Sequence, residues 1–354
     1  MEHKYADLAT LPYTDPEKEH RVAIVLNGDK KCGYHISLNL YNHGYTVYIG
    51  CRNVANYTKA YEQIKLQVNK TNSGTKTKRK NNAKQETAEK KNFGRLEYLP
   101  MDMKDLKTVM RAVLRFQKAE ERLDLLIDSG GGYIGVAHQT TKDGFDLQLQ
   151  TNYVSQALCA LLLLPQINHA KGKIIFMSSV CHFLQYQTCD AFEKQTYDYS
   201  PSFIFSWFRY GLAKTLCIQF LKILAIKNPS ITCYSVNPGI VINTNIFSSL
   251  TTLPVLGIFF WLFFQMVTLL FGVSEQKGAA SVVQLALGRE RSLPNTKEHN
   301  TKSSVDLVSG KYFNKYGIAI NPSPVANNLD NSASTWILTV RLLRDRNIQI
   351  PSDL

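Results

Sequence analysis

The cysteines of this chain show no pairing pattern. There are seven in 354 residues, and no two have the C-x-x-C spacing of a zinc site or a redox pair. Several lie within apolar runs, where a thiol behaves as a small buried side chain. We therefore expect a reducing compartment, with neither disulfides nor structural zinc. The N-terminus is polar and mixed in charge, so the pattern of a secretory signal is also missing.

Acidic residues are scarce relative to basic ones, since 41 Lys and Arg face 28 Asp and Glu. The segment 70–92 holds eight Lys/Arg against two Glu, or six of the thirteen excess positive charges. It has almost no apolar residues, which predicts a disordered basic insertion. It also has no aromatic side chains on which bases could stack. A solvated loop is therefore favoured over a site for anionic lipid, and we expect no nucleic-acid partner.

Short apolar runs rich in β-branched residues alternate with longer helical patterns, as in a parallel sheet covered on both faces. We expect strands at 21–26, 44–50, 95–100, 123–127, 172–177 and 231–236, and helices at 35–43, 54–68, 106–119, 152–164 and 210–227. A single domain over 21–340 would then follow a polar lead-in (1–20) and precede a tail (341–354). In such a sheet the ligand crevice opens at the carboxyl ends of the strands.

Tyr210 and Lys214 stand four residues apart, and this spacing places them on one helix face. A nearby ammonium favours the phenolate and lowers the pKa of a tyrosine from about 10 towards neutral pH. Such a tyrosine can pass a proton to or from a substrate oxygen. The motif alone also fits an ordinary amphipathic helix, so its context decides its meaning.

That context is a series of landmarks at the ends of the predicted strands. They are Leu26-Asn-Gly-Asp-Lys-Lys-Cys-Gly33, Asp128-Ser-Gly-Gly131, Gln150-Thr-Asn-Tyr153, Ser178-Ser179, Tyr210 with Lys214, and Asn237-Pro-Gly239. Their order resembles the short-chain dehydrogenase/reductase family, over most of the chain from Val22 to Phe313. The similarity is greatest to its retinol-dehydrogenase-like branch and, within that, to a fungal lipid-droplet-associated oxidoreductase, through segments 141–145, 147–152, 205–210 and 333–336. The resemblance implies an α/β fold, a Rossmann-type doubly wound parallel sheet of about seven strands.

The resemblance also implies a catalytic tetrad of Asn152, Ser179, Tyr210 and Lys214. Ser179 would polarise the substrate carbonyl, and Tyr210 would donate the proton in reduction or accept it in oxidation. Lys214 would lower the pKa of the tyrosine and bind the nicotinamide ribose. Asn152 would anchor a water that relays protons towards Lys214.

The glycine-rich cofactor turn departs from the family pattern T-G-x-x-x-G-x-G. With Gly33 as the last glycine, Asn27 replaces the first and Lys31 the second, while Gly28 lies between them. A Cβ at the second position would push the pyrophosphate away from the helix N-terminus. Lys30 and Lys31 could instead hold phosphate by charge.

Other cofactor contacts are expected on the neighbouring strand ends. No acidic residue follows the second strand, and Arg52 there suits the 2′-phosphate of NADPH better than the free hydroxyl of NADH. Asp102 fits an acid that contacts adenine, although a helix N-cap explains it equally well. Gly131 would let the cofactor pass close to the backbone, and Pro238-Gly239 would line the nicotinamide end.

The segment 253–273 carries no charge, and Gln265 and Thr268 are its only clearly polar residues. A helix of this length would be about 30 Å long, enough to cross a hydrocarbon core. A true span would separate the last strand from its sheet. We therefore expect an interfacial element or hairpin dipping into one leaflet, or else a buried lid over the substrate.

Two functions remain open from the sequence. One is an NADP-dependent enzyme that interconverts an apolar carbonyl compound (a retinoid, a sterol, or a fatty aldehyde or ketone) and its alcohol, on the cytosolic face of a lipid droplet or the endoplasmic reticulum. The other is a catalytically degenerate relative that acts as a scaffold or interaction protein on the same lipid surface.

Overall fold

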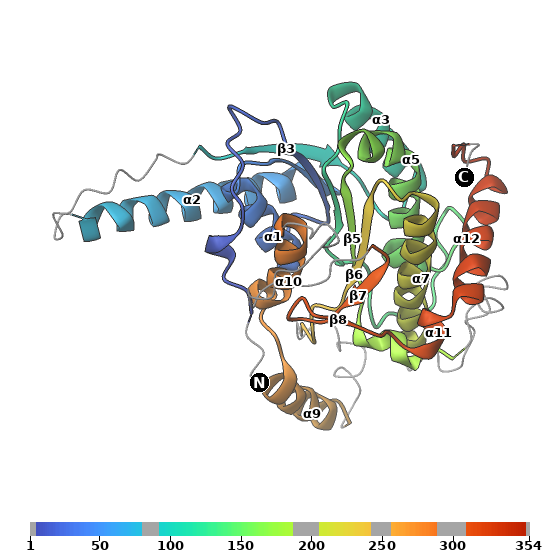
Figure 1. The fold of residues 1–354 in the computed structure, drawn as a ribbon. Helices are drawn as coiled ribbons and strands as arrows, with labels where there is room; N and C mark the ends of the chain where they lie inside the picture. The colour runs from blue at the N-terminus through green and yellow to red at the C-terminus, as the bar shows by residue number, and fades with distance from the viewer. Residues whose placement is uncertain (1–4, 80–91, 187–204, 242–255, 289–308, 352–354) are drawn as a thin grey trace, which may run out of the picture.

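The computed structural model describes residues 5–79, 92–186, 205–241, 256–288 and 309–351. Their strands form one sheet in the order β3-β2-β1-β4-β5-β6-β7-β8 (Figure 1). All pairs are parallel except the last, β7 with β8. The strands are β1 (Val22–Leu26), β2 (Thr46–Cys51), β3 (Arg95–Pro100), β4 (Leu125–Asp128), β5 (Lys173–Met177), β6 (Thr232–Val236), β7 (Lys311–Phe313) and β8 (Ala319–Ile320).

Helices cover both faces of this sheet (Figure 1). One core includes side chains of α3 (Leu106–Ala119), α5 (Ser155–Ala170), α7 (Ser206–Lys227) and α12 (Leu329–Arg344). The other includes side chains of α1 (Lys31–Asn42), α2 (Val54–Arg79) and α10 (Glu275–Leu287). Because successive residues of a strand point to opposite faces, Ile24 packs in the first core and Val25 in the second. The expected doubly wound α/β fold is therefore confirmed.

The strand order places the ligand crevice. From β1 the chain builds outward through β2 and β3 on one side, then returns to add β4 to β8 on the other. At such a switch point the connections leave the carboxyl ends of β1 and β4 in opposite directions and open a crevice between them. Leu26 pairs with Asp128 at this edge.

Strands β1 to β6 start and end within two residues of the six ranges expected from the sequence, and the sheet has eight strands where about seven were predicted. Helix α2 continues to Arg79 and so occupies ten residues of the tract expected to be disordered. Once its first turns are fixed against the sheet, adding residues to a helix costs little free energy. Residues 80–91 of that tract lie outside the described part.

Residues of the expected lead-in (1–20) and of the expected tail (341–354) pack against the rest of the domain. Leu8 and Leu11 pack against the second core, and the Tyr13 hydroxyl donates to the Asn92 carbonyl. At the other end α12 continues to Arg344, and Leu343 and Ile348 are buried in the first core. The domain therefore extends beyond the expected limits of 21 and 340.

The apolar segment forms α9 (Leu256–Phe271), which Figure 1 shows set apart from the layered body. None of the helices in the described ranges is both long and apolar enough to cross a membrane. Many α9 side chains are exposed, including Leu269 at 86% and Ile258 at 68%. Phe263, which is also 53% exposed, and Val267 line the cavity described below. The part of the expected segment at 253–255 lies outside the described residues.

Candidate active site

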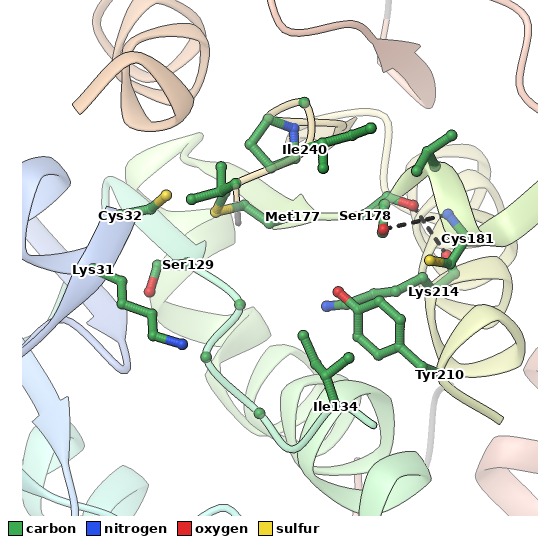
Figure 2. Close-up of a pocket in the computed structure, with 18 of the residues that line it drawn as sticks. Lys31, Cys32, Ser129, Ile134, Met177, Ser178, Cys181, Tyr210, Lys214 and Ile240 are labelled. Carbon is green, nitrogen blue, oxygen red and sulfur yellow. Dashed lines mark hydrogen bonds between the residues drawn. The ribbon is translucent and has the colours of Figure 1, made fainter. Parts of the chain in front are cut away.

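A cavity of about 380 Å³ lies at the carboxyl edge of the sheet. The segments that follow β1, β4, β5 and β6 all contribute to its wall, together with α7 and α9. Figure 2 shows the Tyr210 hydroxyl and the Lys214 ammonium side by side on one wall, with the Lys31 ammonium facing them from the other. Apolar side chains complete the lining: Ile134, Met177, Val180, Trp207, Ile240, Val241, Phe263 and Val267.

Helix α7 carries the phenol–ammonium pair. Tyr210 is 8% and Lys214 1% exposed, and the lysine Nζ lies 5.9 Å from the centre of the tyrosine ring. Burial raises the pKa of Tyr210 to about 12, against the Lys214 charge and the Ser179 hydrogen bond, which both lower it. At neutral pH the tyrosine is therefore a proton donor.

Ser179 follows β5 and lines the cavity together with Tyr210. Its Oγ accepts a hydrogen bond from the Cys181 backbone N–H at 3.3 Å, and its interaction with the phenol lowers the pKa of Tyr210. His182 fixes the backbone of this turn, since its Nδ1 lies 2.6 Å from the Ser179 carbonyl while its Nε2 accepts from the Ser323 N–H. A carbonyl only accepts and an amide N–H only donates, so this imidazole is neutral with its proton on Nδ1.

Asp128 is the counter-ion of Lys214. Its Oδ2 lies 3.5 Å from the lysine Nζ, and both side chains are at most 1% exposed. Among the landmarks that carry the resemblance, Asp128 stands where the short-chain dehydrogenase/reductase family has the first asparagine of an N-N-A-G element, and the sequence indicated no further role for it. Its contact with Lys214 joins residues 86 apart in the chain, so no local pattern could have predicted it.

Asn152 lies in a short π-helix, η2 (Gln150–Val154), that opens into α5. Its Nδ2 donates to the carbonyls of Tyr133 and Gln148, each at 2.8 Å. Its own carbonyl accepts from the thiol of Cys217, one turn after Lys214. Asn152 thus ties the loop after β4 to α7, and its predicted water-relay role stays a prediction.

The altered turn keeps the left-handed backbone conformation that glycine usually adopts. Asn27 and Lys31, at the first two glycine positions, both have positive φ, 55° and 51°. The Asn27 side-chain amide donates to the Gly130 carbonyl at 2.7 Å, so the turn is tied to the loop after β4. At Gly33 a Cβ would lie 2.3 Å from the Asn27 carbonyl oxygen, which explains why the last glycine remains.

A second cavity of about 160 Å³ adjoins the first, since Lys30, Gly131 and Gly132 line both. Its other wall residues include Arg52 from the end of β2 and Asp102 from the end of β3. The Asp102 carboxylate also accepts from the Lys104 backbone N–H, so part of its role is local. The two cavities form one elongated crevice along the edge of the sheet.

Most of the predicted site residues meet in this crevice. The larger cavity is lined by Lys31, Gly131, Ser179, Tyr210, Lys214, Pro238 and Gly239, and the smaller by Asn27, Arg52, Asp102 and Gly131. Gly28, Gly33 and Asn152 line neither and instead shape the backbone around them. Sequence reasoning did not predict the apolar wall side chains, such as Met177 and Trp207, because nothing in their local pattern separates them from core residues.

The crevice suits a dinucleotide. At Gly130 a side chain would meet nothing within 4 Å, and Gly131 has a φ of 84°, so backbone is open to a ligand along this edge. Lys30 and Arg52 line the smaller cavity, while Tyr210 and Ser179 line the larger one. Lys31 opposes the fit, because its side chain enters the larger cavity.

Comparison with known proteins agrees with this geometry. Residues 70–192 match the family model for short chain dehydrogenases. Mouse retinol dehydrogenase 13 is 27% identical over 252 residues, 69% of this chain and 66% of its own length. An uncharacterized oxidoreductase of Schizosaccharomyces pombe is 26% identical over 236 residues, 64% of this chain and 62% of its own. The chain thus aligns with about two thirds of the length of these relatives.

Among solved structures, an uncharacterized protein from Mycobacterium paratuberculosis superposes with a TM-score of 0.64 at 17% identity, covering 98% of this chain and 100% of its own. That likeness concerns the fold alone. The matched family model, the sequence relatives and the Ser–Tyr–Lys cluster together support one conclusion: the chain is similar to short-chain dehydrogenases/reductases, and among them to retinol dehydrogenases.

Proposed function

We propose that the protein is an NADP-dependent oxidoreductase that interconverts an apolar carbonyl compound and its alcohol at a lipid surface. The observation that carries the proposal is the convergence of Ser179, Tyr210 and Lys214 on one cavity. The walls of that cavity are largely apolar, which suits a retinoid, sterol or fatty aldehyde or ketone better than a polar metabolite.

Each residue has a definite task in this reaction. A bound nicotinamide supplies or accepts the hydride. Ser179 donates a hydrogen bond to the substrate oxygen and polarises the carbonyl. In reduction the O–H bond of Tyr210 breaks, and its proton passes to that oxygen as the alcohol forms. Lys214 stabilises the resulting phenolate, and its ammonium can also bind the ribose hydroxyls.

The preference for NADP rests on the smaller cavity. Arg52 and Lys30 both line it, from the end of β2 and the turn after β1. A guanidinium binds a phosphate with two parallel hydrogen bonds, whereas NAD would need an acid for its ribose hydroxyls at this position.

The lipid surface is proposed from α9. The large side chains of α9 that are described as exposed are all apolar, and Phe263 and Val267 also line the cavity. An apolar patch of this kind marks an interaction site on an otherwise polar protein. One helix can therefore cover the cavity and contact lipid, as an interfacial element does. A lipid droplet or the cytosolic face of the endoplasmic reticulum would provide such a surface.

The decisive activity test compares Tyr210→Phe with Tyr57→Phe on a panel of apolar aldehydes and ketones with NADPH. Tyr57 is a matched control because its hydroxyl donates to the Leu96 carbonyl, outside the lining of either cavity. We expect Tyr210→Phe to lower kcat by about 100-fold or more and Tyr57→Phe to leave it near wild type. Equal turnover by both variants would remove Tyr210 as the proton donor.

Lys31 supports a second candidate, a scaffold that has lost turnover, because its side chain enters the space of the dinucleotide. Fluorescence titration with NADPH separates the two candidates. Saturable binding supports the enzyme, and no binding at millimolar cofactor leaves only the scaffold.

Lipid contact is tested by flotation with triolein droplets coated with phosphatidylcholine. Ile258→Asp/Leu269→Asp should abolish flotation, because each change puts a charge on an exposed α9 position. Ile337→Asp is the control, since Ile337 is an exposed apolar residue on α12. If all three proteins float equally, α9 is not the lipid contact.

A further inference from the structure

The last residue of β4 places a carboxylate beneath the catalytic lysine. Asp128 pairs with Leu26 of β1 on one side and Phe176 of β5 on the other, so the sheet holds its backbone in the middle of the fold. Its side chain is fully buried. One carboxylate oxygen accepts from the Gly130 N–H at 3.1 Å, and the other lies 3.5 Å from Lys214 Nζ.

Neither charge of this pair could be buried alone. Burial lowers the pKa of Lys214, but the Asp128 charge more than offsets this and the pKa is raised. Burial also raises the pKa of Asp128, against the lowering effects of Lys214 and of hydrogen bonds from Gly130 and Gln156. By its ordinary pKa Lys214 is much the stronger base of the two, so a proton shared by the pair rests on Lys214.

The Lys214–Asp128 pair changes the electrostatic potential at the Tyr210 phenol. Lys214 alone would favour the phenolate, while the Asp128 charge acts in the opposite direction. The other titratable groups nearby are Cys181 and Cys217, and burial raises the pKa of both, so they remain neutral thiols. Lys31 reaches the cavity from the opposite wall. Burial makes the largest contribution to the raised pKa of Tyr210, and the charges of Lys214 and Asp128 act on it in opposite directions.

We propose that Asp128 is a tuning residue, which partly neutralises Lys214 and so holds Tyr210 in its proton-donating form to higher pH. It touches neither the substrate nor the cofactor space, because it does not line either cavity. Its relevance to catalysis depends on the proposed oxidoreductase function, but its effect on Tyr210 does not.

The consequence is a displaced pH profile rather than a preferred direction. Reduction needs the phenol and oxidation the phenolate, so one ionisation limits both. With Asp128 present, the rate of reduction stays constant up to a more alkaline pH. The rate of oxidation likewise begins to rise only at a more alkaline pH. The ratio of the two rates at any one pH is still set by the overall equilibrium.

The test replaces Asp128 with asparagine, the family residue, and follows the tyrosine itself. Protein labelled with [ζ-13C]tyrosine is titrated without cofactor, and Tyr210→Phe assigns the Tyr210 signal. Wild-type Tyr210, with its pKa near 12, should be about one-tenth ionised at pH 11. In Asp128→Asn the titration should move down by about one pH unit, so that about half is ionised.

Asp124→Asn is the matched control. Asp124 precedes the same strand, is also buried, and is paired with Arg21 and Arg122 at the opposite end of β4. Its replacement should lower stability without moving the Tyr210 signal. An unshifted Tyr210 in Asp128→Asn, or an equal shift in both variants, would overturn the proposal.

If the single variant Asp128→Asn does not fold, a stability measurement tests the coupling of Asp128 with Lys214 instead. Lys214→Met leaves the Asp128 carboxylate buried without its counter-ion, so its urea midpoint should fall well below wild type. Adding Asp128→Asn should restore much of that loss, whereas additive losses would mean that the pair is not coupled.

The two proposals fail separately. A shifted Tyr210 signal in a protein without carbonyl reductase activity would refute the oxidoreductase and keep the tuning role. A working oxidoreductase whose Tyr210 does not respond to Asp128→Asn would do the reverse. In an active enzyme the kcat profile for alcohol oxidation should move by the same amount as the signal.

Discussion

The lysine in the cofactor turn can be tested by restoring the glycine. Lys31 has a φ of 51° and its ammonium faces the cavity from the N-terminus of α1. If that ammonium binds the pyrophosphate of the cofactor, Lys31→Gly removes a charge-assisted hydrogen bond worth about 1.5–3 kcal/mol. The Kd for NADPH should then rise by about 10- to 100-fold.

Stability should change little or improve in the same variant. A left-handed backbone costs a side-chain-bearing residue about 1–2 kcal/mol, and the extra freedom of an unfolded glycine costs about 0.5–1 kcal/mol. The difference predicts a gain of up to about 1.5 kcal/mol in the free energy of unfolding, measured in urea. Weaker NADPH binding in an equally or more stable protein would therefore point to a lost contact and not to damage.

Lys171→Gly is the control for both measurements. Lys171 ends α5 with a φ of 49° and is exposed, away from the crevice. It loses the same charge and the same backbone strain, so its stability should change in parallel while its NADPH affinity stays constant. If Lys31→Gly binds NADPH as tightly as wild type or more tightly, the lysine is an obstruction, and the phosphate-binding role assigned to it is wrong.

Three further changes test other parts of the structure. Arg52→Gln should weaken NADPH by about 10-fold or more and leave NADH unchanged, in parallel fluorescence titrations. His182 is neutral and burial lowers its pKa, so the unfolded chain binds more protons below pH 6.5 and stability falls as the pH drops. His182→Gln should remove that part of the acid sensitivity in urea unfolding between pH 5 and 7. Phe220→Ala should cost about 3–5 kcal/mol by the same method, because this buried ring stacks on Trp336 at 5.3 Å.

Local patterns predicted the strands and the edge where the site lies. Runs such as 22–26 are apolar at every position because β1 is buried on both faces, and this makes a parallel strand easy to identify. Tyr210 and Lys214 were predictable because helical spacing alone places them together. The roles predicted for Asn152 and Ser179 came instead from the order of motifs, and they stay predictions.

Contacts between distant segments could not be predicted in the same way. The Asp128–Lys214 pair depends on how the fold brings the end of β4 next to α7. The extension of α2 depends on the packing of its earlier residues Ala60, Ile64 and Val68 rather than on its composition. The exposure of the α9 side chains could not be predicted from the sequence either. An all-apolar helix has no polar face to indicate its orientation, so the sequence alone did not separate a lid from a lipid contact.

The altered residues of the cofactor edge have compensating contacts, and this bears on the choice between enzyme and relic. Asn27 takes a glycine's backbone form and uses its amide to bond to Gly130. Asp128 replaces an amide with a charge, and Lys214 balances that charge. Lys31 adds a cation whose side chain enters the crevice. A site that had merely lost its ligand would be expected to have collapsed, whereas the described crevice is open and lined in part by basic side chains, which favours the enzyme.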